Sequence, residues 1–205
     1  MSETVTPMMA QYRRLRAEVS PDTILFFRLG DFYEIFFDEA KDVAQLLDLT
    51  LTKRQGMPMC GVPHHAAEGY IAKLIKAGRK VAICDQMEDP AQAKGIVRRD
   101  ITRVITPGTL LEEHVLDAKL NNYLAGVWSD GAVFGMAFLD ISTGAFWIEE
   151  AAAEHAMREN LSRYAPSEVI VPAEQVEYYR AWVREGMVLT GHEDWTFDQD
   201  TARDL

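Results

Sequence analysis

The spacing of apolar residues over the first hundred positions alternates between the period of a helix and that of a strand. After Thr6-Pro7, apolar residues recur at helical spacing and stop before Ser20-Pro21, which predicts one capped helix. Glycine and proline crowd residues 56–63, where we expect a loop. The remaining apolar runs predict strands over 24–29, 32–37, 49–52, 80–84 and 99–106, and helices over 38–48 and 66–77. This pattern is typical of a mixed-sheet α/β domain.

A polar, acidic segment at residues 111–121 separates this region from a second one, so we predict domains over 1–112 and 122–205 with a linker at 113–121. Three antiparallel strands followed by alternating helix and strand is the order of the ribonuclease H fold, although other α/β folds begin likewise. The residues from Gly191 onward complete no element, so we expect the chain to be truncated inside its second domain. The elements expected in this domain are strands over 123–129, 132–141 and 145–149 with a two-residue Asp130-Gly131 turn, a helix over 151–164, a strand over 168–171 and a helix over 173–184.

Charge is distributed unevenly along the 205 residues. The net charge of −11 argues against nucleic-acid binding, because phosphates are bound mainly by Lys and Arg. However, residues 1–110 hold 15 basic against 14 acidic side chains, whereas residues 111–205 hold 6 against 18. Residues 53–103 alone hold 10 basic against 5 acidic. The first half is therefore the half able to meet phosphates, although such a stretch is more often a solvated face.

Composition and motifs exclude several classes of protein. With 48% hydrophobic and 26% charged residues the chain can bury a core, and it has neither a signal segment nor about 18 consecutive apolar residues, so we expect a cytoplasmic protein. Cys60 and Cys84 have no metal-binding spacing, so we expect two reduced thiols. No Gly-Lys dipeptide occurs, so the phosphate-binding loop of ATPases is absent and we expect no such ATP site in this chain.

The most informative local pattern is an aromatic residue and a carboxylate two positions apart, Phe32 and Glu34, just after a Gly-Asp turn. In an extended segment these two side chains point to the same face and Tyr33 points away. An apolar wedge beside a hydrogen-bonding group could unstack a DNA base step from the minor groove. An aromatic residue in such a run is more often a core residue, and both interpretations stay open at this point. The wedge hypothesis requires Tyr33 to be buried.

Clusters of carboxylates suggest a metal-dependent nuclease as the alternative function. Such a site would use Asp31, Glu34 and Asp38 with Lys53 near the attacked phosphate. Asp38 and Glu39 also stand where a helix start favours acidic residues, which needs no metal.

Two weaker candidates lie elsewhere in the chain. A second nuclease site would use Asp140 with Asp130 or Glu149, but Asp130 falls in a turn. The adjacent His64 and His65 could act as a general base or as ligands, although a solvated or capping role is the simpler interpretation.

Five motifs, in the same order, resemble the N-terminal part of the bacterial MutS family of DNA mismatch-recognition proteins. They are Phe27-Arg28-Leu29-Gly30-Asp31-Phe32-Tyr33-Glu34, Leu51-Thr52-Lys53-Arg54, Met59-Cys60-Gly61-Val62-Pro63-His64-His65, Val81-Ala82-Ile83-Cys84-Asp85-Gln86 and Val104-Ile105-Thr106-Pro107-Gly108-Thr109. The resemblance implies a mismatch-binding domain followed by a ribonuclease H-like connector domain. It also implies that the core, lever, clamp and ATPase regions of the family are missing.

The resemblance assigns roles to the two residues singled out above. It implies that Phe32 stacks on the mispaired or unpaired base from the minor groove, and that Glu34 hydrogen-bonds the same base. A protonated Glu34 could donate to a purine N7, whereas an ionised one could accept from a thymine N3–H. Matched duplex would gain only the repulsion between the carboxylate and phosphates.

Further contacts, partners and cofactors are implied in the same way. Seven more residues match regions near the minor groove or the DNA backbone: Leu29, Arg54, Met59, Lys94, Arg98, Arg99 and Arg103. The loop at 55–58 is shorter than in some relatives. The expected partners are duplexes with mismatches or small insertion/deletion loops, MutL through the acidic connector, and a second copy in a homodimer. We expect a nucleoid-associated, non-catalytic chain without a cofactor, ATP and Mg²⁺ being bound by the full-length protein.

Overall fold

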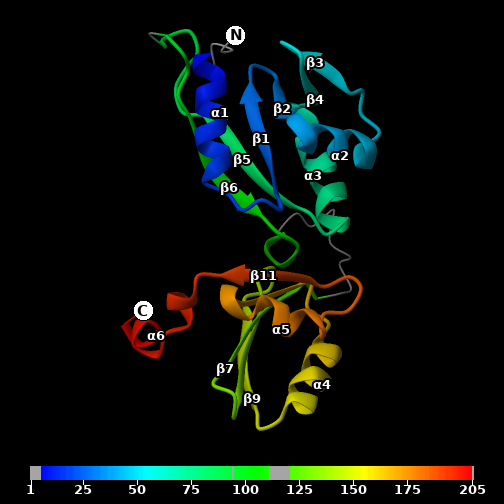
Figure 1. Cartoon of the computed structure of the whole chain (residues 1–205), viewed down its shortest axis with the longest axis vertical. Helices are drawn as coiled ribbons and strands as arrows, with labels where there is room; N and C mark the ends of the chain where they lie inside the picture. The colour runs from blue at the N-terminus through cyan, green and yellow to red at the C-terminus, as the bar shows by residue number, and fades with distance from the viewer. Residues whose placement is uncertain (1–5, 94, 111–120, 205) are drawn as a thin grey trace. The chain divides into compact units, whose positions relative to one another are not determined.

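The computed structural model describes residues 6–93, 95–110 and 121–204 (Figure 1). Contacts divide the chain into two compact units, Met1–Thr106 and Pro107–Leu205. Of the predicted linker at 113–121, residues 113–120 lie outside the described residues and only Asn121 is described. In the described part of the chain, no helix is long and apolar enough to cross a bilayer.

The first unit is a six-stranded mixed sheet with helices on both faces. Its strands lie in the order β3-β4-β2-β1-β5-β6, and only β1 and β5 are parallel neighbours. This arrangement confirms the predicted mixed α/β fold. Its elements are α1 (Pro7–Ala17), β1 (Thr23–Leu29), β2 (Phe32–Phe36), α2 (Phe37–Leu47), β3 (Thr52–Arg54), β4 (Met57–Pro63), the 3-10 turn η1 (His64–Ala66), α3 (Ala67–Lys76), β5 (Lys80–Gln86) and β6 (Arg99–Ile105).

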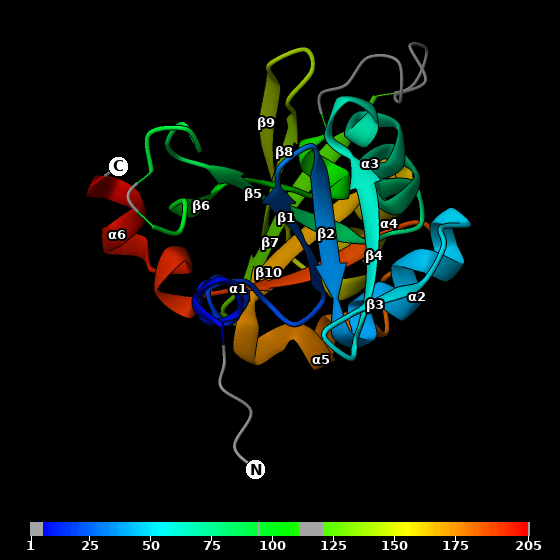
Figure 2. The same cartoon turned by 90° about the horizontal axis from the view of Figure 1, so that it is seen from above.

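The two faces of this sheet bury alternate residues of the same strands. Leu25 and Phe27 of β1 pack with Tyr12 and Leu15 of α1 in one core cluster. Phe26 lies between them in sequence and packs its ring against Tyr33, 5.8 Å away between centroids. Figure 2 shows α1 on one side of β1, β2 and β4 and shows α2 and α3 on the other. The face that carries α1 is therefore the face from which Phe36 also projects, since Phe36 stacks edge-on against Tyr12.

Residues 57–63 form strand β4 where the sequence predicts a loop. This strand pairs with β3 through residues 57–59 and with β2 through residues 59–63. Pro58 thus has no partner strand on the β2 side, and Pro63 has none on the β3 side. Each proline, which lacks a backbone N–H, can therefore face the side on which no inter-strand hydrogen bond is required. The strand predicted at 49–52 is also displaced, because pairing in that segment begins only at Thr52.

The second unit is a five-stranded sheet in the order β11-β10-β7-β8-β9. Strands β7, β8 and β9 are antiparallel, whereas β10 runs parallel to both β7 and β11, the order predicted for the ribonuclease H fold. Its elements are the 3-10 turn η2 (Pro107–Thr109), β7 (Tyr123–Ser129), β8 (Phe134–Asp140), β9 (Ala145–Ala151), α4 (Glu154–Tyr164), β10 (Glu168–Pro172), η3 (Ala173–Gln175), α5 (Val176–Arg180), β11 (Val188–His192), η4 (Asp194–Phe197) and α6 (Gln199–Asp204).

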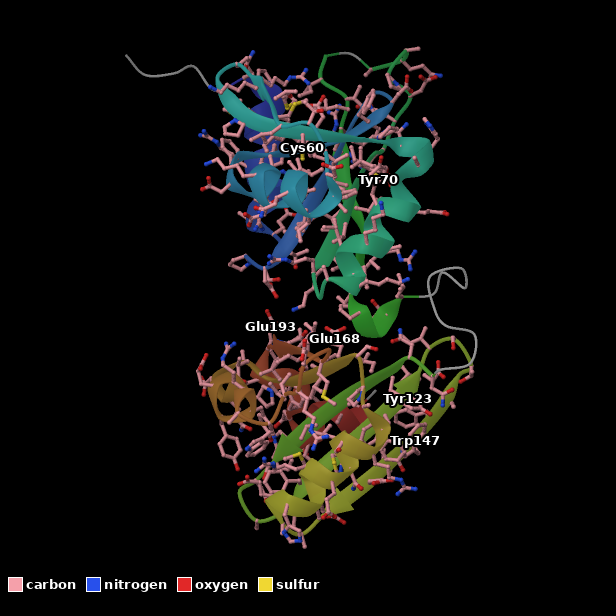
Figure 3. All side chains as sticks on the ribbon, turned by 90° about the vertical axis from the view of Figure 1, so that its right-hand side faces the viewer. Cys60, Tyr70, Tyr123, Trp147, Glu168 and Glu193 are labelled. Carbon is pink, nitrogen blue, oxygen red and sulfur yellow. The ribbon has the colours of Figure 1, made fainter. Side chains whose placement is uncertain are left out.

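Aromatic rings and one buried carboxylate hold the second unit together. Tyr123 meets the ring of Trp147 edge-on at 5.1 Å, and Figure 3 shows the two side chains next to each other. Glu168 is buried at the start of β10, where it accepts hydrogen bonds from the Gly108 amide (3.1 Å) and the Thr190 hydroxyl (2.5 Å). These bonds tie η2 and β11 to the sheet and satisfy a buried charge that would otherwise be costly.

Three details of the second unit differ from the prediction. Four residues, 130–133, join β7 to β8 instead of two, because the Asp130 carboxylate accepts from the amides of Ala132 (2.8 Å) and Val133 (2.9 Å) and widens the turn. The helix predicted over 173–184 ends at Arg180. Strand β11 and helix α6 occupy the region where no element was predicted, because both are short and weakly apolar.

Candidate nucleic-acid interface

A tight hairpin positions the candidate site. Strands β1 and β2 pair through Leu29 and Phe32, so Gly30 and Asp31 alone form the turn. Gly30 has a φ of 59°, a conformation that glycine adopts at no steric cost and that type II′ turns require at their first central position. The turn therefore fixes Phe32 as the first residue of β2.

Phe32 and Tyr33 point to opposite faces of the sheet, as the alternation along the strand predicts, and they also differ in exposure. Phe32 is 47% exposed, and it is the one exposed aromatic residue among the described residues of the first unit. Tyr33 is 5% exposed, and its hydroxyl donates a 2.7 Å hydrogen bond to Asp85 on β5. Burial, followed by this hydrogen bond, raises the pKa of Tyr33, so the phenol stays neutral and donates. The requirement that Tyr33 be buried is met.

Glu34 lies on the same face as Phe32 but is buried. Its backbone is flanked by Phe27 on β1 and Gly61 on β4. Its carboxylate is paired with Arg54 of β3, whose Nη1 lies 2.7 Å from both Oε1 and Oε2. The site therefore presents an exposed ring next to a carboxylate whose charge is compensated within the protein.

Small and apolar residues surround these side chains on the same face. A Cβ placed on Gly61 would lie 3.6 Å from Cδ1 of Phe32, an ordinary van der Waals distance, so Gly61 lies directly beside the Phe32 ring. Met59 pairs with Phe36 and packs half-buried against the α1 cluster. Leu29 is half-buried against the same cluster. The predicted contacts Leu29 and Met59 thus adjoin Phe32 and Glu34 on one sheet face.

The basic residues predicted to contact DNA occupy three different environments. Arg98 is exposed before β6. Its backbone amide donates to Glu88 at 2.7 Å and its backbone carbonyl accepts from the Met87 amide at 2.9 Å. Arg103 is exposed on β6, which is an edge strand. Lys94 lies outside the described residues. Arg98 and Arg103 are therefore placed on the surface of the unit that holds Phe32.

Arg99 differs from this expectation, because it is a buried residue of the fold. It is 4% exposed, and its guanidinium lies 5.0 Å from the ring centre of Phe27. It donates to the backbone oxygens of Arg28 (2.5 Å) and Val97 (2.8 Å) and to the side chain of Gln11 (3.2 Å). Burial lowers the pKa of Arg99. With 4% exposure and these bonds made, Arg99 presents almost no surface to a phosphate.

The carboxylates proposed for a nuclease do not form a metal site. Glu34 is held by Arg54, Asp38 is exposed and pairs with Lys41 at 2.7 Å, and Asp31 is exposed at the hairpin turn. Glu39 pairs with Arg16 instead. Among the residues that the structure describes, no three His, Cys, Asp or Glu side chains could hold a metal ion together.

The second proposed carboxylate set is likewise separated. Asp130 and Asp140 lie at opposite ends of β8, and Glu149 accepts a 2.5 Å hydrogen bond from Tyr164. Asp140 accepts from the amide (3.0 Å) and hydroxyl (2.6 Å) of Ser142. Burial alone would raise the pKa of Asp140, but these hydrogen bonds lower it. Each carboxylate therefore has a local structural role.

The two histidines of η1 and the two cysteines also have structural explanations. His64 is exposed, its ring lies 5.4 Å from that of Tyr33, and its amide donates to the Asp31 carbonyl at 2.8 Å, behind the hairpin turn. His65 is exposed. Cys60 and Cys84 are buried free thiols, and burial raises the pKa of Cys60 to about 11.

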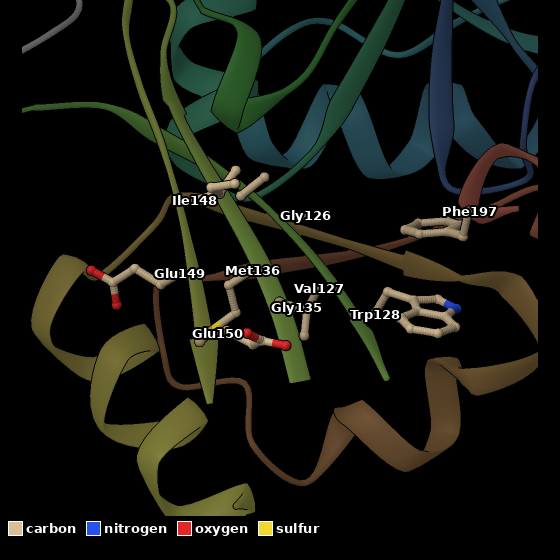
Figure 4. A pocket seen from close by; sticks show the side chains of 10 residues that line it. Gly126, Val127, Trp128, Gly135, Met136, Ile148, Glu149, Glu150 and Phe197 are labelled. Carbon is tan, nitrogen blue, oxygen red and sulfur yellow. The ribbon is translucent and has the colours of Figure 1, made fainter. Parts of the chain in front are cut away.

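A separate hollow of about 530 Å³ lies on the second unit, on strands β7, β8 and β9 (Figure 4). Trp128 and Phe197 stand side by side at one end of it, and Ile148 projects from β9. Of its two carboxylates, Glu149 turns away from the others. The hollow is lined mainly by apolar side chains of the second unit.

Three contributors to the site were not foreseen. The pairing of Arg54 with Glu34, the hydrogen bond that Tyr33 donates to Asp85 and the proximity of Gly61 to Phe32 all join residues distant in sequence. The sequence places Arg54, Gly61 and Asp85 inside recognisable motifs, but no periodicity in it specifies these contacts.

Comparison with models of protein families identifies the family of this chain. One family model, MutS domain I, matches residues 6–114, and a second, MutS domain II, matches residues 122–205. The chain belongs to the MutS family. Because both N-terminal MutS domains are present in family order, this MutS chain has a role in mismatch recognition in DNA repair and binds DNA. The resemblance stated from the five motifs is confirmed.

Proposed function

We propose that Phe32 inserts from the minor groove beside a mispaired or unpaired base, and that Glu34 hydrogen-bonds that base. The observation that carries this proposal is the contrast along β2, where Phe32 is 47% exposed and Tyr33 is 5% exposed. An exposed phenylalanine at the rigid start of a strand, with its neighbour anchored in the core, is a wedge whose position is fixed before binding.

The selectivity of such a wedge comes from the deformability of the DNA. A mismatch has already lost pairing and stacking energy, so unstacking it costs less than unstacking a paired step. Stacking of the Phe32 ring on the exposed base is worth about 1–3 kcal/mol, and this gain is the same for any base. The wedge therefore discriminates through the cost of distortion and does not depend on base identity.

Glu34 adds discrimination through hydrogen bonding. An ionised carboxylate accepts from a thymine N3–H, and a protonated one donates to a purine N7. Matched DNA offers no such hydrogen-bond partner in the minor groove. Its phosphates are therefore repelled by the carboxylate charge without a compensating hydrogen bond. The burial of Glu34 beside Phe32 limits this contact to a base that the wedge has displaced.

Exposed basic residues of the same unit supply contacts to the DNA backbone in this proposal. In this proposal Arg98, Arg103 and Lys94 contact phosphates, and Leu29 and Met59 contact the DNA minor groove beside the wedge.

The partners of the whole protein follow from family membership as proposals. The second unit, in which residues 111–205 hold 18 acidic against 6 basic residues, fits a protein partner better than DNA, and MutL is the partner expected. We further propose that the full-length protein forms a homodimer and binds ATP and Mg²⁺ through its other domains. This chain itself catalyses no reaction in the proposal.

The test is the affinity of full-length parent and Phe32→Ala protein for matched duplex and for duplex with a G·T pair or an unpaired T. Loss of stacking worth about 1–3 kcal/mol predicts that the preference for mismatched DNA falls about 5- to 150-fold, while salt-sensitive general binding persists. The control is Leu46→Ala, which removes an equally exposed apolar side chain from α2. Equal discrimination by parent and Phe32→Ala protein contradicts the proposal.

A further inference from the structure

The contact between Arg54 and Glu34 joins the end of β3 to the middle of β2. The strand register places Arg54 opposite Met57 and Glu34 opposite Gly61, yet the ends of the two side chains meet. Arg54 Nη1 lies 2.7 Å from each carboxylate oxygen. The Arg54 side chain is 42% exposed, whereas that of Glu34 is 10% exposed. The β3–β4 hairpin thus places the guanidinium of Arg54, at the edge of the sheet, against the buried Glu34 carboxylate.

We infer that Arg54 is a specificity-determining positioning residue, which holds the Glu34 carboxylate in the orientation that reads a displaced base and compensates its charge. This inference rests on the proposed function of Glu34. It assigns Arg54 an action through another protein side chain, in addition to any contact with DNA.

The electrostatic argument starts from the burial of Glu34. A buried carboxylate without a partner is costly, and the cost rises when phosphates approach from the exposed side. Arg54 offsets this charge directly. The buried Arg99 guanidinium also feels the Glu34 charge, which raises the pKa of Arg99 against the larger, lowering effect of burial. Arg54 is therefore the guanidinium group in direct contact with Glu34, whereas Arg99 acts on it only through its charge.

The hydrogen-bonding capacity of the pair leaves room for a base. A carboxylate has about four lone-pair sites on its two oxygens, and Arg54 uses one on each. Within the described residues, the other guanidinium nitrogens of Arg54 have no hydrogen-bond partner. A base can therefore bond to Glu34 while Arg54 stays in place, and Arg54 acts as a holder of Glu34 instead of a competitor for it.

The experiment is a double-mutant cycle in the full-length protein. Arg54→Gln is made in the parent and in the Glu34→Gln background, and affinities for G·T and matched duplexes are measured for all four proteins. For a partly exposed pair we expect Arg54→Gln to lower the mismatched-to-matched affinity ratio roughly three- to fivefold in the parent. In the Glu34→Gln background, where no carboxylate remains to be positioned, we expect the ratio to be unchanged.

Two further variants separate charge from position. Lys53→Gln removes the same charge from the neighbouring, exposed residue of β3, which lies on the opposite face of the strand, so we expect no change in the ratio. Arg54→Lys keeps the charge and one hydrogen bond, so we expect it to restore part of the ratio. Urea denaturation of each variant checks that its fold is intact.

Other results overturn the inference. An equal loss of affinity for both duplexes in both backgrounds makes Arg54 a phosphate contact only, and a higher ratio in Arg54→Gln makes it a competitor for Glu34. Phe32→Ala, measured alongside, distinguishes this failure from failure of the proposed function. If Phe32→Ala loses discrimination while Arg54→Gln does not, the wedge stands and the role of Arg54 is wrong.

Discussion

Tyr33 lies between the two side chains proposed to act on DNA, and its burial determines how they are presented. Its ring packs between Phe26 and His64, and its hydroxyl bonds to Asp85. Because alternate residues of a strand face opposite ways, anchoring Tyr33 in the core on one face holds Phe32 on the opposite face of the sheet.

Removing the Tyr33 hydroxyl tests this anchor. Tyr33→Phe keeps the ring but deletes the bond to Asp85, so we expect the free energy of unfolding to fall by about 1 kcal/mol. Tyr70→Phe is the control, since Tyr70 is half-buried on α3 and its hydroxyl has no hydrogen-bond partner among the described residues. Urea denaturation followed by circular dichroism measures both. An equal loss in the two variants contradicts the role assigned to the Asp85 bond.

For single residues, the sequence predicts the face to which a side chain points better than it predicts the side chain's hydrogen-bond partner. The alternation of Phe32, Tyr33 and Glu34 follows from the period of a strand and is found as expected. The partner of Glu34 depends on the path of the hairpin from β3 to β4, which no local pattern encodes. The environment of Arg99 was also not predictable from the sequence. Its charge suggests a phosphate contact, whereas packing against Phe27 buries it.

The β1–β2 hairpin is the element on which the site depends. Its two-residue turn leaves Phe32 paired with Leu29, and the turn requires a positive φ at Gly30. The sequence identifies this hairpin because glycine and aspartate separate two apolar runs. The same reasoning fails at β4, where glycine and proline indicate a loop although neighbouring strands on either side pair with part of the segment.

Replacing glycine by alanine is predicted to have opposite effects on stability at two positions of the first unit. Gly30→Ala places a Cβ in the left-handed region, so we expect a loss of about 1 kcal/mol. Gly69→Ala lies in helix α3 with no atom within 4 Å of the new methyl group, so we expect a gain of about 0.5–1 kcal/mol. Urea denaturation measures both. A stabilising Gly30→Ala contradicts the assigned turn.

The whole chain combines two sheets of different charge. The first is nearly neutral and carries the exposed phenylalanine, and the second is strongly acidic. The sequence of elements from β7 to α5 in the second unit could be predicted as a three-stranded meander followed by alternating helix and strand, and it is found. The short β11 and α6 could not, because their few apolar residues give no clear period.

Salt dependence tests which unit meets the DNA backbone. Arg98→Gln removes an exposed cation from the first unit, so we expect weaker binding to every duplex and a salt slope shallower by about 0.9, the value for one lost phosphate contact. Arg180→Gln removes a cation of the second unit that pairs with Glu177 at 2.9 Å, and we expect the slope to stay the same. Fluorescence anisotropy between low and moderate salt gives both slopes. A shallower slope for Arg180→Gln alone contradicts the placement.

The most direct test of the account observes base unstacking itself. A duplex carrying 2-aminopurine beside an unpaired thymine becomes more fluorescent when its stacking is broken. At saturating protein, we expect the full-length parent to raise this fluorescence and Phe32→Ala to leave it at the level of free duplex, because the ring that separates the bases is gone. A parent complex without the increase, or the same increase with Phe32→Ala, would contradict the claim that Phe32 is the wedge.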